Sequence, residues 1–338
     1  MKILIDAFGG DNSPDEIIEG ALLALAERQD FTASLIGKKD IIEEKLAGKS
    51  FDGSRVEIID AADVISCEEE PTLAVRRKPD SSIVKGIKLL KDEEEYKAFV
   101  SAGSTGAVLV AATLKLGRIE GISRPSLCPI LPTLSGGKVF LTDSGANADC
   151  KAINLAQFAV MASVYAESLG INEPKVALLS NGTEDEKGNA LNHETFPILK
   201  EMKGINFIGN MEARDILSGK ADIVVTDGFS GNIALKSIEG AVKTVMKAIK
   251  DAAFSSFSAK IGGLMLKKPL GALKETLDYN NKGGALFLGV NKPVIKAHGS
   301  SGRLAFKNAV LQAVDYAWFD LKDKITERLA LSGAEISR

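Results

Sequence analysis

Histidine and cysteine are scarce in this chain, and their scarcity excludes several kinds of functional site. The sequence holds only two histidines, His193 and His298, which rules out a histidine-rich metal centre. Its three cysteines, Cys67, Cys128 and Cys150, lack the spacing of a disulfide framework or a zinc site, as expected in a reducing cytoplasm. We therefore expect no bound metal, no cofactor and a cytoplasmic location.

Long apolar runs, an excess of positive charge and aromatic residues are also lacking. No stretch approaches the roughly 18 apolar residues that cross a membrane, and Asp6 comes too early for a signal peptide. A net charge of −3 and an aromatic content of 6% argue against binding to nucleic acid. The 338 residues, of which 45% are hydrophobic, are enough for a large globular core.

Several common catalytic signatures are missing as well. The chain has no G-x-G-x-x-G motif, no P-loop, no G-x-S-x-G and no H-E-x-x-H, and no cysteine lies in the setting of a nucleophile. Its glycine-rich turns instead carry Asn, Ser, Thr, Asp and Lys. Side chains of these types hold an oxyanion and position a reactant, and they do not indicate a covalent intermediate.

Strand-like and helix-like patterns alternate along the chain, which predicts an α/β fold. The first elements are a strand at Ile3–Ala7, a helix at Asp15–Glu27, a strand at Leu35–Ile36, a helix at Asp40–Leu46 and a strand at Val56–Ile59. This alternation implies crossover connections and a mostly parallel sheet with helices on both sides. Because no repeat or obvious linker interrupts the pattern, we expect a single large domain over residues 1–338.

The stretch Ala221–Lys236 is the one around which the other motifs are organised. A β-branched run at Ile223–Thr226 predicts a buried strand, Asp227–Asn232 predicts a turn, and the periodicity from Ile233 onward predicts a long helix. The N–H groups and the positive dipole end of such a helix suit an anion. A capped helix that follows a tight turn is the alternative interpretation.

Five other apolar runs end in similar small, polar, glycine-bearing turns. The pairs of run and turn are Ile3–Ala7 with Phe8–Asn12, Phe99–Ser101 with Ala102–Gly106, Val139–Leu141 with Thr142–Asn147, Val176–Leu179 with Ser180–Thr183, and Val294–Ala297 with His298–Gly302. In a parallel sheet all these turns lie at the carboxyl edge, where such folds bind ligands. Asp6, Asp143 and Asp227 each close a strand, and a turn-capping role is favoured for each.

Taken together, these motifs resemble a known family over nearly the whole chain. The stretches IDAFGGDNSP, RRKPDSS, VSAGSTGA, DSGANADCK, NGTEDEKGN, GNMEARDIL, TDGFSGNIALKSIEG and PVIKAHGSSG resemble those of the bacterial phosphate acyltransferases of phospholipid synthesis. The resemblance implies transfer of a long fatty acyl group from acyl carrier protein to inorganic phosphate. The acyl phosphate would then serve a membrane glycerol 3-phosphate acyltransferase. The implied architecture is a homodimer of Rossmann-like α/β/α sandwiches, related to phosphotransacetylases and isopropylmalate-type dehydrogenases.

The chain departs from the family pattern in three places. Asn12 and Ser13 stand where the family usually has His-Ala, so a histidine is not required there. Ser144 stands in DSGAN where DVGAN is familiar, and Cys150–Leu155 replaces CKPEHL. These differences bear on local contacts and leave the family resemblance intact.

The resemblance and the polar turns together point to a phosphate site at the sheet edge. Phosphate is largely dianionic at neutral pH, so it needs to be held against the thioester carbonyl rather than deprotonated. Asn232 and Lys236, one helical turn apart, are candidate anion donors, and His298 is the candidate group that protonates the leaving thiolate. A histidine that only hydrogen-bonds within its own turn is the alternative interpretation of His298. Further candidates for substrate binding are Gly9, Gly10, Asp11, Ser104, Thr105, Asn147, Asp227, Ser230, Ser300 and Ser301.

A basic cluster at Arg76, Arg77 and Lys78 is the candidate docking site for the carrier protein. Carrier proteins are acidic and this chain is also net negative, so a local basic patch must attract the partner. A solvated charged loop is the alternative interpretation of the same residues.

Residues 245–275 predict a helical hairpin that protrudes from the domain. Gly262 and Gly263 break the helical pattern, and apolar residues crowd the break. We call these residues the hairpin tip: Phe254, Phe257, Ile261, Leu264, Met265 and Leu266. The long helix is expected to pack against a second subunit. The tip either joins that interface or the core, or contacts the inner membrane surface, which would shorten the path of a labile acyl phosphate.

Three other functions stay open at this point. A metal- and NAD-dependent dehydrogenase would need clustered carboxylates, whereas the aspartates here are spread over separate turns. A short-chain phosphotransacetylase that acts on coenzyme A thioesters would use nearly the same chemistry. A non-catalytic phosphate-binding or scaffold protein would form no acyl phosphate from any donor.

Overall fold

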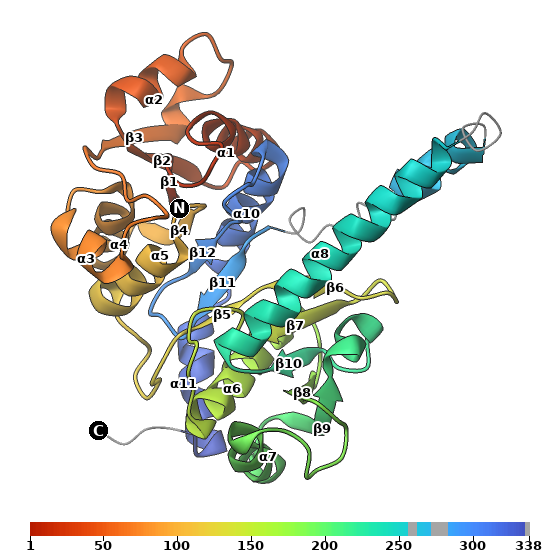
Figure 1. Ribbon diagram of the computed structural model, residues 1–338. Helices are drawn as coiled ribbons and strands as arrows, with labels where there is room; N and C mark the ends of the chain where they lie inside the picture. Colours follow the sequence, from red (N-terminus) through yellow and green to blue (C-terminus); the bar gives the residue numbers. More distant parts are fainter. Residues whose placement is uncertain (256–261, 272–282, 335–338) are drawn as a thin grey trace.

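The structure is a computed structural model that describes residues 1–255, 262–271 and 283–334. Phe257 and Ile261 of the hairpin tip lie outside the described residues. Two sheets lie side by side, and each is covered by helices on both faces (Figure 1). The predicted α/β/α sandwich with mostly parallel strands is therefore confirmed.

The first sheet contains seven strands and the N-terminal half of the chain supplies most of them. In spatial order they are β3 (Val56–Asp60), β2 (Thr32–Gly37), β1 (Lys2–Asp6), β4 (Tyr96–Ser101), β12 (Val294–Lys296), β11 (Ala285–Leu288) and β5 (Ser126–Cys128). All neighbours are parallel except β11, which runs antiparallel to both β12 and β5. Strand β1 is buried on both faces, which explains its continuous apolar run.

Helices cover both faces of this sheet because its strands alternate apolar side chains between two cores. Ile3 and Ile5 face α1 (Asp15–Glu27) and α10 (Arg303–Tyr316). Leu4 faces the core of α3 (Pro71–Arg77), α4 (Ser82–Asp92) and α5 (Thr105–Ala111). Helix α2 (Lys39–Leu46) packs against α1 and β3. Short helical turns occupy Gly53–Arg55, Ala112–Leu116 and Ala213–Ser218.

The second sheet contains five strands from the middle of the chain. In spatial order they are β6 (Ile130–Pro132), β7 (Lys138–Thr142), β10 (Ile223–Val225), β8 (Lys175–Ser180) and β9 (Asn206–Glu212), and only β6 is antiparallel to its neighbour. Helices α6 (Ala152–Ser168) and α7 (Ala190–Glu201) cover one face, and the start of α8 (Gly228–Ala253) covers the other. Helix α11 (Leu321–Ser332) packs on α6.

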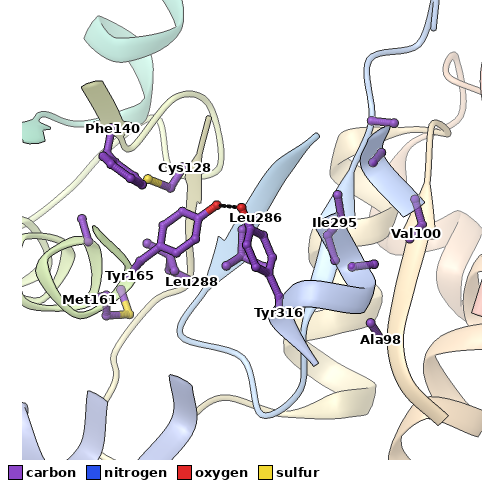
Figure 2. Close-up of a cluster of buried hydrophobic side chains, with 14 of the residues drawn as sticks. Ala98, Val100, Cys128, Phe140, Met161, Tyr165, Leu286, Leu288, Ile295 and Tyr316 are labelled. Carbon is purple, nitrogen blue, oxygen red and sulfur yellow. Dashed lines mark hydrogen bonds between the residues drawn. The ribbon is translucent and has the colours of Figure 1, made fainter. Parts of the chain in front are cut away.

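The core continues from one sheet to the other around α6, which is buried along most of its length. Figure 2 shows Tyr165 of α6 and Tyr316 of α10 turned toward each other, with a hydrogen bond between their hydroxyls. Gln312 donates to the Tyr316 hydroxyl and accepts the backbone N–H of Gly284 at 2.7 Å. This network therefore fixes the start of β11 against the core.

Only the first part of α8 belongs to the body of the molecule. Ala234 and Leu235 are buried and Ile238 is half-buried, whereas Val245 is exposed. Beyond that point the helix projects away from both sheets (Figure 1). Residues 262–271 are helical and return beside its end, since a Cβ added at Gly263 would lie 2.8 Å from that of Ala253.

Most elements predicted from sequence are confirmed. The helix at Asp15–Glu27 has the predicted bounds, and the strand runs before the six turns are strands β1, β4, β7, β8, β10 and β12. Two expectations are wrong. The helix expected from Ile233 begins at Gly228, because Asp227 caps it. The six turns do not share one edge, because three of their strands belong to each sheet.

Candidate active site

A central cleft of about 350 Å³ lies between the strand ends of the two sheets. One side comes from the turns after β4 and β12, and includes Thr105, Lys296 and His298. The other comes from the turn after β7 and from α8, and includes Asn232 and Lys236. Among the described residues, the lining is Thr105, Leu127, Pro129, Ile130, Ser144, Gly145, Asn232, Leu235, Lys236, Glu239, Gly283, Gly284, Ala285, Lys296, Ala297, His298 and Gly299. The structure thus brings the three predicted catalytic residues together.

Three backbone amides in the first turn of α8 donate hydrogen bonds within the protein itself. The Asp227 carboxylate accepts the Ser230 amide at 2.8 Å and the Ser230 hydroxyl at 2.9 Å. The Gly228 amide donates to the Asn147 carbonyl, and the Gly231 amide donates to the Asp227 carbonyl. The interpretation of these three amides as anion donors is therefore wrong, and the capped-helix alternative is confirmed.

Two polar side chains of α8 line the cleft. Asn232 is exposed and lies against Gly145, where an added Cβ would be 3.6 Å from the Asn232 Cγ. Lys236, four residues on, is half-exposed and pairs with Glu239 at 3.0 Å. An amide and an ammonium group therefore face the same space from successive turns of one helix.

The turn after β7 is built around a buried carboxylate. Asp143 accepts backbone N–H groups from Leu127, Gly145, Ala146 and Asn147 at 2.7–3.2 Å. The Asn147 side chain donates to Asp143 at 2.8 Å and to the Pro125 carbonyl at 2.7 Å. These two residues hold the shape of the turn, and neither lines the cleft.

The first and last glycine-rich turns are joined to each other. The Asp11 amide donates to the Gly299 carbonyl at 2.8 Å, and Asn12 donates to the carbonyls of Ser300 and Ser301. Gly10 has a positive φ of 93°, and a Cβ there would lie 2.7 Å from the Gly299 oxygen. Asn12, which replaces the family's usual histidine, therefore ties the two turns together.

The remaining predicted binding residues divide between the cleft and its surroundings. Thr105 lines the cleft, whereas Ser104 caps α5 by accepting the Ala107 amide at 3.4 Å. Gly9 packs against Asp6 and Gly103, where an added Cβ would be 2.5–2.6 Å away. Ser230 lines a separate hollow, together with residues 179–181 at the end of β8.

His298 faces the cleft from the turn after β12. Its Nδ1 accepts the Ser300 amide at 3.2 Å and lies 2.8 Å from the Ser300 hydroxyl. Because Nδ1 is an acceptor, the ring proton belongs on Nε2. Burial and the nearby Lys236 lower the pKa of His298, so the imidazole is neutral at pH 7 and offers an N–H donor.

Lys296 is the residue of the cleft that sequence reasoning missed. It ends β12 with 8% of its surface exposed, and its Nζ donates to the carbonyl oxygens of Ala102 and Ala297. Burial lowers the pKa of Lys296 to about 8. A signal was present, since this lysine interrupts an apolar run, Val294-Ile295-Lys296-Ala297, immediately before the His298 turn.

One wall of the cleft is apolar, which sequence reasoning also missed. Leu127 and Ile130 come from β5 and β6, Pro129 lies between these strands, and Leu235 of α8 and Ala285 of β11 line the same cleft. Polar donors and an apolar wall in the same cleft suit a ligand that has a charged end and a hydrocarbon part.

Comparison with known proteins first defines the class. The structure is similar to a phosphotransacetylase from Streptococcus pyogenes, with a TM-score of 0.62, 20% identity and 94% coverage of both chains. It is similar to a branched-chain phosphotransacylase from Enterococcus faecalis, with a TM-score of 0.58, 13% identity and coverage of 94% and 99%. At these identities the likeness establishes a shared fold.

The sequence comparison then defines the family. A family model described as "Fatty acid synthesis protein" matches residues 1–323. The chain is 46% identical to a phosphate acyltransferase from Clostridium perfringens over 330 residues, which are 97% of each chain. It is also 46% identical to one from Thermoanaerobacter pseudethanolicus over 338 residues, with full coverage of both. The chain belongs to the phosphate acyltransferase family, and it is an acyltransferase.

Proposed function

We propose that the protein transfers a long-chain fatty acyl group from acyl carrier protein to inorganic phosphate, which yields acyl phosphate for phosphatidic acid synthesis. The observation that carries the proposal is the meeting of Asn232, Lys236 and His298 with apolar side chains in the central cleft. A phosphate dianion fits the polar side, and the thioester with the start of its acyl chain fits the apolar side.

Positioning accounts for most of the chemistry in this proposal. Lys236 holds the phosphate, and one of its oxygens attacks the thioester carbonyl. The Asn232 amide donates to the negative charge that develops in the transition state. The Nε2–H of the neutral His298 ring donates a hydrogen bond to the carbonyl oxygen as negative charge develops on it. Preorganised donors of this kind and a fixed approach need no strong base, because the nucleophile is already anionic.

The direct test is a comparison of acyl donors. The protein is incubated with phosphate and palmitoyl carrier protein, palmitoyl coenzyme A or acetyl coenzyme A, and acyl phosphate is trapped with hydroxylamine. We expect product mainly from the carrier-bound palmitoyl group. A preference for acetyl coenzyme A would favour a short-chain phosphotransacetylase, and no product from any donor would favour a phosphate-binding protein without catalytic activity.

The basic cluster supports docking of the carrier protein through two of its three members. Arg76 and Arg77 are exposed at the end of α3. The Lys78 ammonium group is already paired within the protein, since its Nζ donates to Glu69 and to the Val64 carbonyl, both at 2.8 Å. The beginning of α3 packs against α5 beside Thr105, since Pro71 touches Gly106. A carrier bound at the arginines would therefore sit near the cleft.

Reversing the charges of Arg76 and Arg77 should raise the KM for acyl carrier protein about tenfold or more and leave kcat unchanged. Surface charges act mainly on the rate at which two proteins associate. Raised salt should therefore weaken binding of the carrier protein to the wild type in the same way. The matched control is Lys322→Glu with Lys324→Glu, a pair of exposed lysines on α11. An unchanged KM at low salt would remove the two arginines from the docking site.

The hairpin supports contact with a membrane surface through its described residues. Phe254, Leu264, Met265 and Leu266 are 62%, 73%, 79% and 54% exposed. Exposed apolar side chains that lie this close together in the chain mark a surface for contact with a partner or a membrane. Among the described residues no helix is both long and apolar enough to span a bilayer. We propose that α8 pairs with a second subunit, so that a homodimer presents two tips to the inner membrane surface, near the enzyme that uses acyl phosphate.

Leu264→Glu combined with Leu266→Glu should lower binding to anionic liposomes about tenfold or more, with activity on soluble donors retained. Each buried leucine contributes roughly 1.5–3 kcal/mol, and glutamate is repelled by anionic headgroups. Liposome co-sedimentation gives the binding and light scattering gives the oligomeric state. The control is Leu114→Glu with Leu331→Glu, since these leucines are exposed elsewhere. Dissociation of the dimer, or an absence of wild-type binding, would contradict the membrane role.

A further inference from the structure

Lys296 is a buried cation at the point where three turns of the cleft meet. It ends β12, and its Nζ lies 3.2 Å from the Ala102 carbonyl in the turn after β4. The Ala102 oxygen lies 3.3 Å from where a Cβ on Gly10 would be, and 4.0 Å from one on Gly299. The ammonium group is therefore placed among the first turn, the turn after β4 and the turn after β12.

The bonds that this ammonium group makes are to neutral acceptors. Within residues 1–255, 262–271 and 283–334, its hydrogen bonds go to two carbonyl oxygens, those of Ala102 and Ala297. The buried Asp6 carboxylate acts on it only at a distance and accepts the Ser101 hydroxyl at 2.7 Å and the Phe8 amide at 3.2 Å. An ammonium has three N–H donors, and the described part of the chain engages two of them, so one is left over for a ligand in the cleft that Lys296 lines.

Charged and titratable groups on several neighbouring elements act on the pKa of Lys296. Cys67 from the loop after β3, Asp6 at the end of β1 and Asp11 from the turn after β1 favour its protonation. Lys236 from α8 opposes it, while His298 shares its turn and Glu239 pairs with Lys236. Burial outweighs the acidic neighbours and lowers the pKa to about 8, close to the ordinary thiol value of about 8.5.

We propose that Lys296 is the proton donor to the leaving sulfur of the thioester, an inference that rests on the proposed function. A phosphate oxygen forms a bond to the carbonyl carbon, the carbon–sulfur bond breaks, and the sulfur takes a proton from the Lys296 ammonium. The acyl phosphate formed from HPO₄²⁻ carries one proton, which returns to the neutral amine. Each turnover thus moves one proton from phosphate to thiol through Lys296 and consumes no other reagent.

The other two basic side chains of the cleft suit this role less well. His298 uses Nδ1 to accept the Ser300 amide, and a neutral imidazole donates a hydrogen bond without readily releasing its proton. Lys236 is half-exposed, and its ammonium group is already paired with the Glu239 carboxylate at 3.0 Å. Lys296 alone combines burial, neutral partners and a spare N–H among these three.

The test compares donors whose leaving groups differ in their need for a proton. Palmitoyl carrier protein releases an alkyl thiol, and a 4-nitrothiophenyl ester releases a much more acidic aryl thiol. Lys296→Arg keeps the charge and the donors but cannot give up a proton. We expect Lys296→Arg to lower kcat/KM for the carrier substrate about 10²–10⁴-fold and that for the aryl ester less than about tenfold. Lys296→Met, which fills a similar volume, should show the same selective loss.

Two further measurements separate this role from a structural one. The wild-type kcat/KM with the carrier substrate should fall above about pH 8, as Lys296 loses its proton, and that fall should be absent in Lys296→Arg. The control is Lys292→Met, because Lys292 also donates to two backbone carbonyls, those of Glu93 and Tyr96, outside the cleft. Lys292→Met should leave kcat/KM unchanged with both acyl donors.

The outcomes distinguish this inference from the proposed function. Equal losses with both donors, or an unchanged pH profile in Lys296→Arg, would overturn the role of Lys296 while acyl transfer by the wild type still stands. Failure of the wild type to form acyl phosphate from any thioester would overturn the proposed function itself. If Lys296→Met does not fold, the donor ratio and pH profile of Lys296→Arg decide.

Discussion

Replacing Asn232 with alanine should lower kcat about 10²–10³-fold and leave the fold intact. Asn232 is exposed at the mouth of the central cleft, so its removal leaves no cavity in the core. Its amide faces the space between the turn after β7 and the turn after β12, where negative charge develops during acyl transfer. Loss of one preorganised donor to a developing anion has an effect of this size.

Steady-state kinetics with phosphate and acyl carrier protein varied separately measure this effect. Ser237→Ala, on an exposed position of α8 that does not line the cleft, serves as the control. Lys236→Ala should also reduce turnover or phosphate affinity, with a smaller loss expected because Lys236 already pairs with Glu239. Wild-type kinetics in Asn232→Ala would remove that residue from the site.

Gly231→Ala should destabilise the protein by about 3 kcal/mol or more and abolish activity. Gly231 is buried where the first turn of α8 crosses the end of β7, and an added Cβ would lie 1.9 Å from the Asp143 carbonyl oxygen. Both groups in this contact are backbone, so either α8 or the turn after β7 would have to shift to make room. Overpacking of this kind typically costs about 1–3 kcal/mol, and more where backbone must shift. The displaced helix would also carry Asn232 and Lys236 out of the cleft.

The same helix offers a matched control for this prediction. Gly240 is exposed and a Cβ there would meet nothing within 4 Å, so Gly240→Ala should stabilise the helix by about 0.5–1 kcal/mol. Guanidinium unfolding of both variants gives the two free energies. A neutral Gly231→Ala would mean that α8 does not lie against the turn after β7 as described.

The sequence was most informative where a residue's role depends on its neighbours in the chain. The apolar run Ile223-Val224-Val225 predicts β10, and the periodic pattern of Asp15–Glu27 predicts α1, because burial of each element follows its own repeat. Asp143 and Asp227 hold turns, as their positions after strands suggest. The glycine-rich turns also indicate the correct end of the strands for the cleft.

What sequence reasoning could not supply is the pairing of distant segments. The apolar sequence of a strand does not specify which of two sheets the strand joins. Sequence reasoning therefore predicts all six turns at the carboxyl edge of one sheet. The cleft forms because the turn after β12 meets the start of α8 across the two sheets, about 60 residues apart in sequence. Lys296 and the wall at Leu127 and Ile130 belong to the cleft only through that meeting.

The most direct test of the central claim is to follow the phosphorus atom. Palmitoyl carrier protein and phosphate are mixed with the wild-type protein, and ³¹P NMR is recorded together with release of the carrier thiol. The account predicts an acyl phosphate resonance that grows in step with release of the free thiol. The rate of this growth should be about 10²–10³-fold lower in Asn232→Ala. Thiol release without an acyl phosphate signal, or an equal rate in the two proteins, would contradict it.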